Sequence, residues 1–197
     1  MATAVTLVLT AEEPALLRVA RDLFPEAETL ALTRDELRPW VPFGGPLFAA
    51  LASCAAGSCV GLVCPVRVRP DPGRAPCGTT DPPAGRLLAV SDHVNLALRG
   101  PLTGPWPAGV PRTFPPLADI YQPAIVRDRG GARVYSSGVV AGVSDVERLT
   151  PFEDVTAHEE GLTAISDSLV PPAIVAAYYG LTLAACGVTR TDHNDEE

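Results

Sequence analysis

The 197-residue sequence predicts an α/β sandwich with a largely parallel or mixed sheet. Strand-like and helix-like segments alternate along the chain, which is the pattern of a sheet covered by helices. The strand-like segments are continuously apolar, as expected of strands that are buried on both faces. Apolar residues make up 47% of the chain, which is enough for a sizeable core. No repeat and no shift in composition divides the sequence, so we expect a single domain over residues 1–197.

The first part of the chain contains two signals for the start of a helix. Residues 4–9 are apolar and predict a buried strand. Residues 10–13 then have the S/T-x-x-E pattern of a capping box, which predicts a helix over about 12–23. Residues 33–36 repeat the pattern and predict a shorter helix that stops at Pro39. Further helices are expected at 46–56, 145–149 and 171–179, and further strands at 59–64, 87–90, 133–141, 162–165 and 183–188.

The charged residues exclude several classes of function. All 15 basic residues are arginine, and 23 acidic residues give a net charge of −8. An acidic surface repels nucleic acid and anionic membranes, so we expect neither as a partner. The lack of lysine excludes Schiff-base chemistry and Walker-type phosphate loops. Arginine-only usage with many alanines and prolines is typical of a GC-rich bacterial genome.

The cysteines and histidines indicate a reduced protein without a metal. Five cysteines in a sequence without a secretion signal predict a cytoplasmic location. Cys54, Cys59 and Cys64 recur every five residues, without the paired spacing of a zinc site. We therefore interpret them as small buried apolar residues and expect neither a metal nor another cofactor.

Distinctive motifs occur in a fixed order in the second half of the chain. They are SDHVNL at 91–96 with PLTGP at 101–105, FPPLADIY at 114–121, SLVPPAIVAAYYGL at 168–181, and TD at 191–192. In that order they resemble "DHINL…NPL.GPN", "FP.MSDAYD", "STVPEVIVARHCGL" and a strand-ending Thr-Asn or Thr-Asp of the purine nucleoside phosphorylase and methylthioadenosine phosphorylase family. The resemblance reaches from about residue 45 to 193, and more weakly to the first strand.

This resemblance implies a fold, an assembly and a substrate class. The implied fold is a three-layer sandwich whose mixed, partly barrel-like sheet is flanked by helices. The implied assembly is a homo-oligomer, either a trimer or a hexamer. The family cleaves the N-glycosidic bond of a purine nucleoside with phosphate, through a ribosyl cation, so the implied partner is a small nucleoside-like molecule.

The resemblance also implies roles for residues near the end of the chain. Ser168 matches the serine that helps to bind phosphate, and Asp167 replaces the methionine beneath the ribose. Asp192 matches the residue that recognises the base, next to Thr191, and His193 adds a group that titrates near neutrality. Asp167 and Ser168 also precede a proline-started helix, so helix N-capping is the alternative role for them.

Four further residues have two interpretations each. Tyr121 and His93 lie in the motifs and could bind substrate. The alternative for His93 is a structural hydrogen bond, which is more common for a buried histidine, and the alternative for Tyr121 is a subunit contact, which its motif also provides in the family. Arg67 and Arg69 could bind an anion, whereas an exposed arginine pair is more often solvated surface.

The phosphate half of the family's site departs from the pattern. The glycine-rich loop is replaced by the acidic segment 10–13, which would repel phosphate. The strand with the family's "R.H.YEG" motif is skipped, "TNAAGG" is replaced by 64–69, and "GPSFET" is degraded to 142–147. The chain also stops where the family's terminal helix should begin.

We therefore expect a degenerate, shortened enzyme of this family that has lost phosphate binding. Asp167 and Asp192, with His193, would act as general acid and base or stabilise an oxocarbenium-like cation. The substrate would be a nucleoside-like or other cyclic small molecule in bacterial specialised metabolism, and the reaction hydrolysis, elimination or cyclisation. The alternatives are a non-catalytic ligand-binding or partner subunit and, third, a residual phosphorylase.

Overall fold

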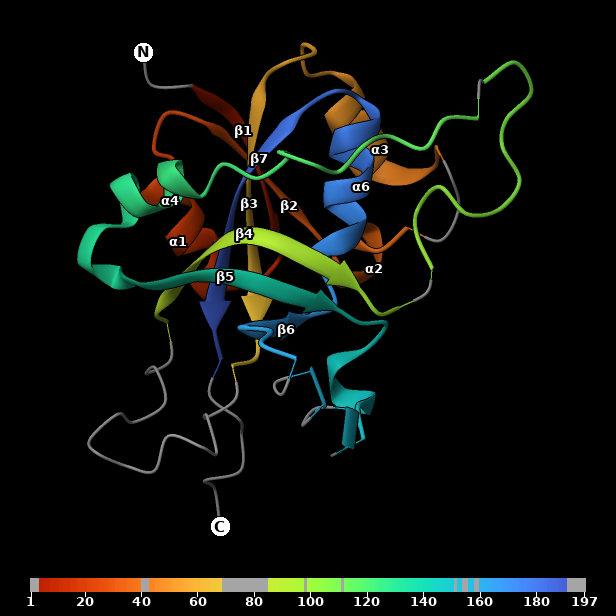
Figure 1. Cartoon of the computed structure of the whole chain (residues 1–197). Helices are drawn as coiled ribbons and strands as arrows, with labels where there is room; N and C mark the ends of the chain where they lie inside the picture. The colour runs from red at the N-terminus through yellow and green to blue at the C-terminus, as the bar shows by residue number, and fades with distance from the viewer. Residues whose placement is uncertain are drawn as a thin grey trace.

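A seven-stranded mixed sheet forms the centre of the fold (Figure 1). The computed structural model describes residues 4–39, 43–68, 85–97, 99–110, 112–150, 152–153, 156–157 and 160–190. The strands are β1 (Val5–Ala11), β2 (Glu28–Leu32), β3 (Cys59–Val66), β4 (Leu87–Asn95), β5 (Val134–Gly142), β6 (Ala164–Ser166) and β7 (Thr182–Thr189). Their order in the sheet is β2-β1-β3-β7-β4-β5-β6.

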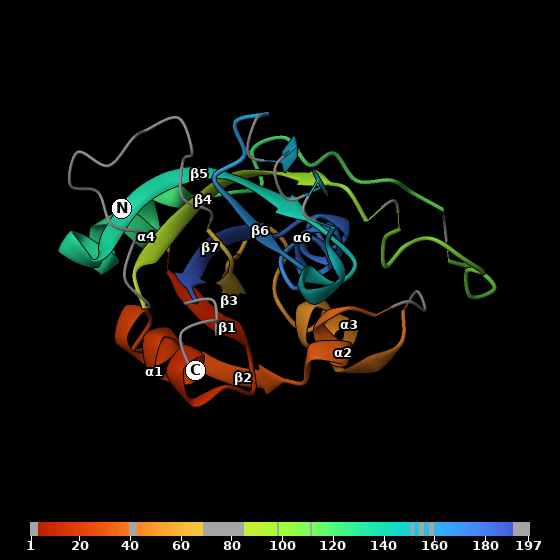
Figure 2. The same ribbon diagram turned by 90° about the horizontal axis from the view of Figure 1, so that it is seen from below.

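The sheet changes direction once and then curls back on itself. Strands β2, β1, β3 and β7 are parallel, β4 is antiparallel to β7, and β5 and β6 run parallel to β4. The end of β3 then meets β6, the strand at the edge of the sheet. Arg67, next to β3, and Ile165 of β6 form an antiparallel bridge with two N–H···O bonds of 2.9 Å. This contact closes one end of the sheet into the partly barrel-like form that the family resemblance implies (Figure 2).

Helices cover both faces of the sheet, which confirms the three-layer sandwich. On one side lie α1 (Pro14–Leu23) and α4 (Pro123–Gly130). On the other lie α2 (Arg34–Leu37), α3 (Gly45–Ala52) and α6 (Val170–Tyr178) (Figures 1 and 2). Strand and helix residues share one large apolar core, to which α1 contributes Leu16, Ala20 and Leu23. Among the described residues, no helix has the length and apolarity of a membrane span.

The two capping boxes have opposite outcomes. The second is confirmed: the Thr33 hydroxyl accepts from the Glu36 amide at 3.3 Å, and the Glu36 carboxylate accepts from the Thr33 amide at 2.8 Å. The first is wrong, because Thr10 still belongs to β1. Helix α1 begins only at Pro14, after an extended N-cap residue, Glu13, that makes no side-chain cap. The helix predicted at 145–149 is only a 3₁₀ turn over Val146–Arg148.

Two elements were not expected from the sequence, and one of them changes the site. Helix α4 covers β4, β5 and β7. Strand β2 pairs in parallel with β1, in a stretch for which we expected no strand. It does not carry the R.H.YEG motif, and α2 follows it directly with Arg34 and Arg38.

Candidate functional site

A cleft of about 460 Å³ opens at the C-terminal ends of β1, β3, β6 and β7. Its lining includes Glu13 after β1, Arg67 after β3, Asp167 after β6 and Arg190 after β7. Sites of α/β proteins typically lie outside such carboxyl ends, where loops from neighbouring strands converge. The cleft is thus the natural candidate for the functional site.

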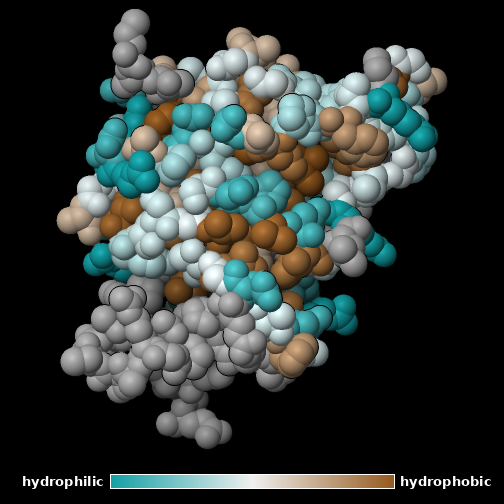
Figure 3. Space-filling model, viewed as in Figure 1, coloured by the Kyte–Doolittle hydropathy of each residue, from teal (hydrophilic) through white to brown (hydrophobic). Residues whose placement is uncertain are grey.

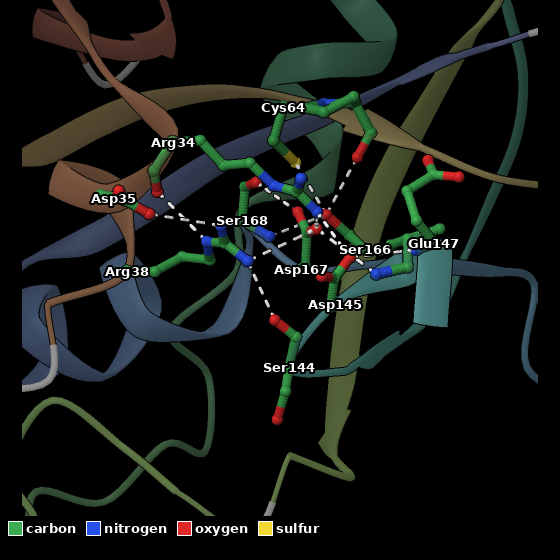
Figure 4. A network of polar contacts seen from close by, with 12 residues as sticks. Arg34, Asp35, Arg38, Cys64, Ser144, Asp145, Glu147, Ser166, Asp167 and Ser168 are labelled. Atoms are coloured by element: carbon green, nitrogen blue, oxygen red, sulfur yellow. Dashed lines mark hydrogen bonds and ion pairs between the residues drawn. The ribbon is translucent and has the colours of Figure 1, made fainter. Parts of the chain in front are cut away.

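Asp167 is the most strongly engaged residue of the cleft (Figure 4). Only 5% of it is exposed. The Ser168 hydroxyl donates to its Oδ1 at 2.7 Å, and the Arg34 guanidinium donates to its Oδ2. Arg38 Nη1 lies 3.6 Å from the same oxygen, and the Val146 amide donates to it at 3.4 Å. Helix α6 has Leu169 as N-cap and no side-chain cap, so neither Asp167 nor Ser168 caps the helix.

The two arginines reach Asp167 from the turn of helix that follows β2. The capping box fixes this helix, and Arg34 and Arg38 are one turn apart on it. Arg34 also pairs with Asp145 at 3.0 Å. Arg38 donates to the carbonyls of Ser144 at 2.9 Å and Arg34 at 3.2 Å. The sequence signal for the helix was recognised, but its two arginines were not identified as site residues.

These contacts determine the protonation state of Asp167. Burial alone would raise the pKa of Asp167, but the hydrogen bonds from Ser168 and Arg34 and the charges of Arg34 and Arg38 outweigh it. The net effect is a pKa below the usual value, so the carboxyl is ionised at neutral pH. An ionised carboxylate can accept a proton or stabilise a cation, but it cannot donate a proton.

The lowered pKa of Asp167 predicts a loss of stability in acid. A carboxyl whose pKa is lower in the folded state stabilises the fold above its unfolded pKa of about 3.9, and this stabilisation disappears as the pH falls through the folded pKa. Urea unfolding between about pH 2 and pH 6 should therefore show a steeper acid loss in the wild type than in Asp167→Asn, which cannot titrate. Parallel curves for the two proteins would contradict this prediction.

Ser166 fixes the backbone that carries Asp167, and no motif in the sequence indicates this role. It is fully buried, its hydroxyl donates to the Pro65 carbonyl at 2.9 Å, and it accepts from the Ser168 amide at 3.2 Å. These bonds join the ends of β3 and β6 beneath the cleft. Burial raises the pKa of the neighbouring Cys64 thiol to about 12, so that thiol stays protonated. Glu147, which also lines the cleft, was likewise not identified from the sequence.

His93 and Tyr121 contact each other rather than the cleft. The Tyr121 hydroxyl lies 2.7 Å from His93 Nδ1, and the rings meet edge to face with centroids 5.6 Å apart. Burial lowers the pKa of His93, so the ring is neutral. Neither residue lines the cleft, which fits the structural alternative for His93; a substrate-binding role for the pair stays a prediction.

The remaining predicted residues lie at the edge of the described part of the chain or beyond it. Thr191, Asp192, His193 and Arg69 lie outside the described residues. Arg190, the last described residue, forms an ion pair with Glu13. One of the two carboxylates that were expected to repel phosphate is thus paired with a cation of the same cleft. Among the described residues, no cluster of three or more potential metal ligands occurs.

Comparison with solved structures identifies the fold. No protein-family model and no curated protein sequence matches the chain. The purine nucleoside phosphorylase of Schistosoma mansoni in complex with BCX-34 superimposes with a TM-score of 0.52 and 16% identity over 71% of this chain and 53% of that one. A purine nucleoside phosphorylase with ribose-1-phosphate, and a Schistosoma purine nucleoside phosphorylase with hypoxanthine, both give a TM-score of 0.51 and 18% identity over 66% of this chain and 48% of theirs. The chain spans about half the length of these proteins. Together with the mixed, partly closed sheet, these similarities show that the chain has the nucleoside phosphorylase fold.

Proposed function

We propose that this chain is an enzyme that acts, without phosphate, on a nucleoside-like or other cyclic small molecule bound in the cleft. The observation that carries the proposal is the ionised, nearly buried carboxylate of Asp167 in the wall of the cleft. The fold supports the substrate class, because structures with the same fold are complexes with adenosine, guanosine and hypoxanthine.

The ion pairs of the cleft support a reaction without phosphate. Arg34 already pairs with Asp167 and Asp145, and Arg190 already pairs with Glu13. A phosphate would have to displace carboxylates that are part of the chain, and one of them, Asp167, is already nearly buried beside its arginines. Hydrolysis, elimination or cyclisation of the bound molecule needs no such displacement.

The charge of Asp167 suggests a division of roles. Cleavage of an N-glycosidic bond needs negative charge near the sugar, where a cation develops, and a proton for the departing base. Asp167 is suited to the first role or to accepting a proton. We assign the proton donor to Asp192 with His193, which follow Arg190 by two and three residues in the sequence, next to Thr191. Ser168 would orient the Asp167 carboxylate through their 2.7 Å hydrogen bond.

A non-catalytic ligand-binding subunit is the second candidate, and one observation favours it. Both oxygens of Asp167 already accept hydrogen bonds, and the charge of the carboxylate is balanced by two arginines. Such a carboxylate could position a ligand without taking part in a reaction. A residual phosphorylase is the third candidate.

A panel of purine nucleosides and related cyclic metabolites separates these candidates. We expect a ligand that raises the melting temperature and is converted to product in phosphate-free buffer. Asp167→Asn and Asp192→Asn should each lower turnover by about 100-fold or more, the usual contribution of a general acid or base. Glu160→Gln, at an exposed acid away from the cleft lining, is the matched control and should leave turnover unchanged. Stabilisation without product would favour the binding subunit, and full activity of both aspartate variants would contradict the assigned roles.

We further propose that the chain is a homo-oligomer, a trimer or hexamer, in the cytoplasm and in bacterial specialised metabolism. The oligomer is supported by large apolar side chains left at the surface, among them Phe114 with 78% and Leu96 with 47% exposure. Figure 3 shows apolar residues gathered on the face over β4 and β5. Sedimentation velocity tests the assembly, and a monomer at all concentrations would contradict it.

A further inference from the structure

We propose that the Asp167 carboxylate occupies a preformed cradle for a small oxyanion, so that removing it creates a binding site for free acetate or inorganic phosphate. This inference deepens the proposed function, since it explains why the cleft does not need phosphate. It rests on the proposed function only in taking this cleft as the functional site. Its test measures the binding of an anion rather than the turnover of a substrate.

The donors around Asp167 have the composition of an oxyanion site. A hydroxyl (Ser168), two guanidinium groups (Arg34 and Arg38) and a backbone amide (Val146) converge on the one carboxylate. They come from three separate segments of the chain: α2, the 3₁₀ turn after β5, and the segment before α6. Guanidinium groups, hydroxyls and backbone amides are the donors that proteins use for carboxylate and phosphate.

Most of these donors are held in place by contacts that do not involve Asp167. Arg38 donates to the carbonyls of Ser144 and Arg34, and Arg34 pairs with Asp145. The Ser168 backbone is fixed by the hydroxyl of Ser166. Figure 4 shows the arginines reaching from α2 towards Asp167, with Ser144 below the Arg38 guanidinium. The cradle should therefore persist when the Asp167 side chain is removed.

Charge and access both favour an anion in the emptied cradle. Without Asp167, Arg34 and Arg38 face the site with Asp145, which is 33% exposed, and Asp35, which is 98% exposed and screened by water. The four charges cancel formally, but the carboxylate of Asp35 is screened by water, so the positive charge of Arg34 and Arg38 predominates at the emptied position. Asp167 and Ser168 both line the 460 Å³ cleft, so an ion from solution can reach the position.

The tether explains why the wild-type chain keeps its own carboxylate in the cradle. A group attached to the backbone competes at an effective concentration of about millimolar or higher, without losing the translational freedom that a free ion loses on binding. Free phosphate at a similar concentration therefore competes at a disadvantage with the Asp167 carboxylate. Truncation to alanine removes this competitor and leaves the donors.

The test compares wild type, Asp167→Ala and the matched control Asp145→Ala in sodium acetate, sodium phosphate and sodium chloride at equal ionic strength. In Asp167→Ala, acetate or phosphate should raise the melting temperature by about 3–5 °C over chloride and bind at least about tenfold more tightly than to wild type in calorimetry. Wild type and Asp145→Ala should show no difference among the three salts. Adding Arg38→Ala or Ser168→Ala to Asp167→Ala should abolish the effect.

Three results would overturn the proposal. One is an Asp167→Ala protein that is folded but does not distinguish acetate or phosphate from chloride. Another is wild type that binds phosphate as tightly as Asp167→Ala does. The third concerns folding. If Asp167→Ala is unfolded in chloride, the variant should refold from urea when acetate or phosphate is present, and failure to refold in both salts would contradict the cradle. None of these results depends on whether the chain has an enzymatic activity.

Discussion

Asp167→Ala is expected to lower the free energy of unfolding by about 3 kcal/mol at neutral pH. The substitution leaves two guanidinium groups around a position that is only 5% exposed, and one of them, Arg38, has a side chain that is itself only 11% exposed. Removing one partner of a buried ion pair costs more than the pair contributes, because the other charge stays desolvated. Urea unfolding monitored by circular dichroism measures the difference.

Asp145→Ala is the matched control for this prediction. Asp145 pairs with the same arginine, Arg34, at 3.0 Å, but its side chain is 33% exposed. Its removal should therefore cost less than about 1 kcal/mol, as for most ion pairs near the surface. If both variants lose the same free energy of unfolding, the burial of Asp167 is not the reason why its removal destabilises the fold.

Gly142→Ala is expected to be the most damaging conservative substitution near the site, at about 2 kcal/mol. A Cβ at this position in β5 would lie 3.0 Å from Val170 Cβ and would collide with Val170 Cγ2. Val170 begins α6 and is 3% exposed, so it cannot move into solvent. Because α6 begins two residues after Ser168, a shift of its first turn also disturbs the donors around Asp167.

A double-mutant cycle with Val170→Ala tests the cause of this loss. Val170→Ala removes the methyl group that the new Cβ would strike, so Gly142→Ala should cost at least about 1 kcal/mol less in that background. Urea unfolding of the four proteins of the cycle gives the coupling. Additive losses would show that the penalty does not come from contact with Val170.

The order of most elements could be predicted because a buried strand shows in the sequence as a continuous run of apolar residues. The apolar runs of β1, β3 and β7 were recognised as buried strands, and the box at Thr33 fixed the start of α2. The box at Thr10 failed because the apolar run of β1 continues through Ala11 and because Pro14 sets the first helical residue. Strand β2 was missed because it is a five-residue edge strand that is mostly half-buried, and such a strand lacks a strong apolar run.

The site could be predicted only where its residues belong to a recognisable motif. Asp167 and Ser168 were identified in this way, and the structure places both in the cleft wall. Arg34 and Arg38 were not, since Arg34 lies 133 residues from Asp167 in the sequence and nothing in its neighbours indicates the contact. The sequence also left open whether Asp167 is an acid, a base or a cation stabiliser. The donors around it lower its pKa, which favours the base or the cation stabiliser over the acid.

Release of free purine from adenosine, guanosine and methylthioadenosine, measured with and without inorganic phosphate at equal ionic strength, is the most direct test of a phosphate-free cleft. Because the Asp167 carboxylate occupies the cradle of donors around it, phosphate competes for that position at a disadvantage. The wild-type chain should therefore form product at a rate that added phosphate does not change. Product that forms only when phosphate is present, accompanied by ribose 1-phosphate or its methylthio analogue, would contradict that conclusion.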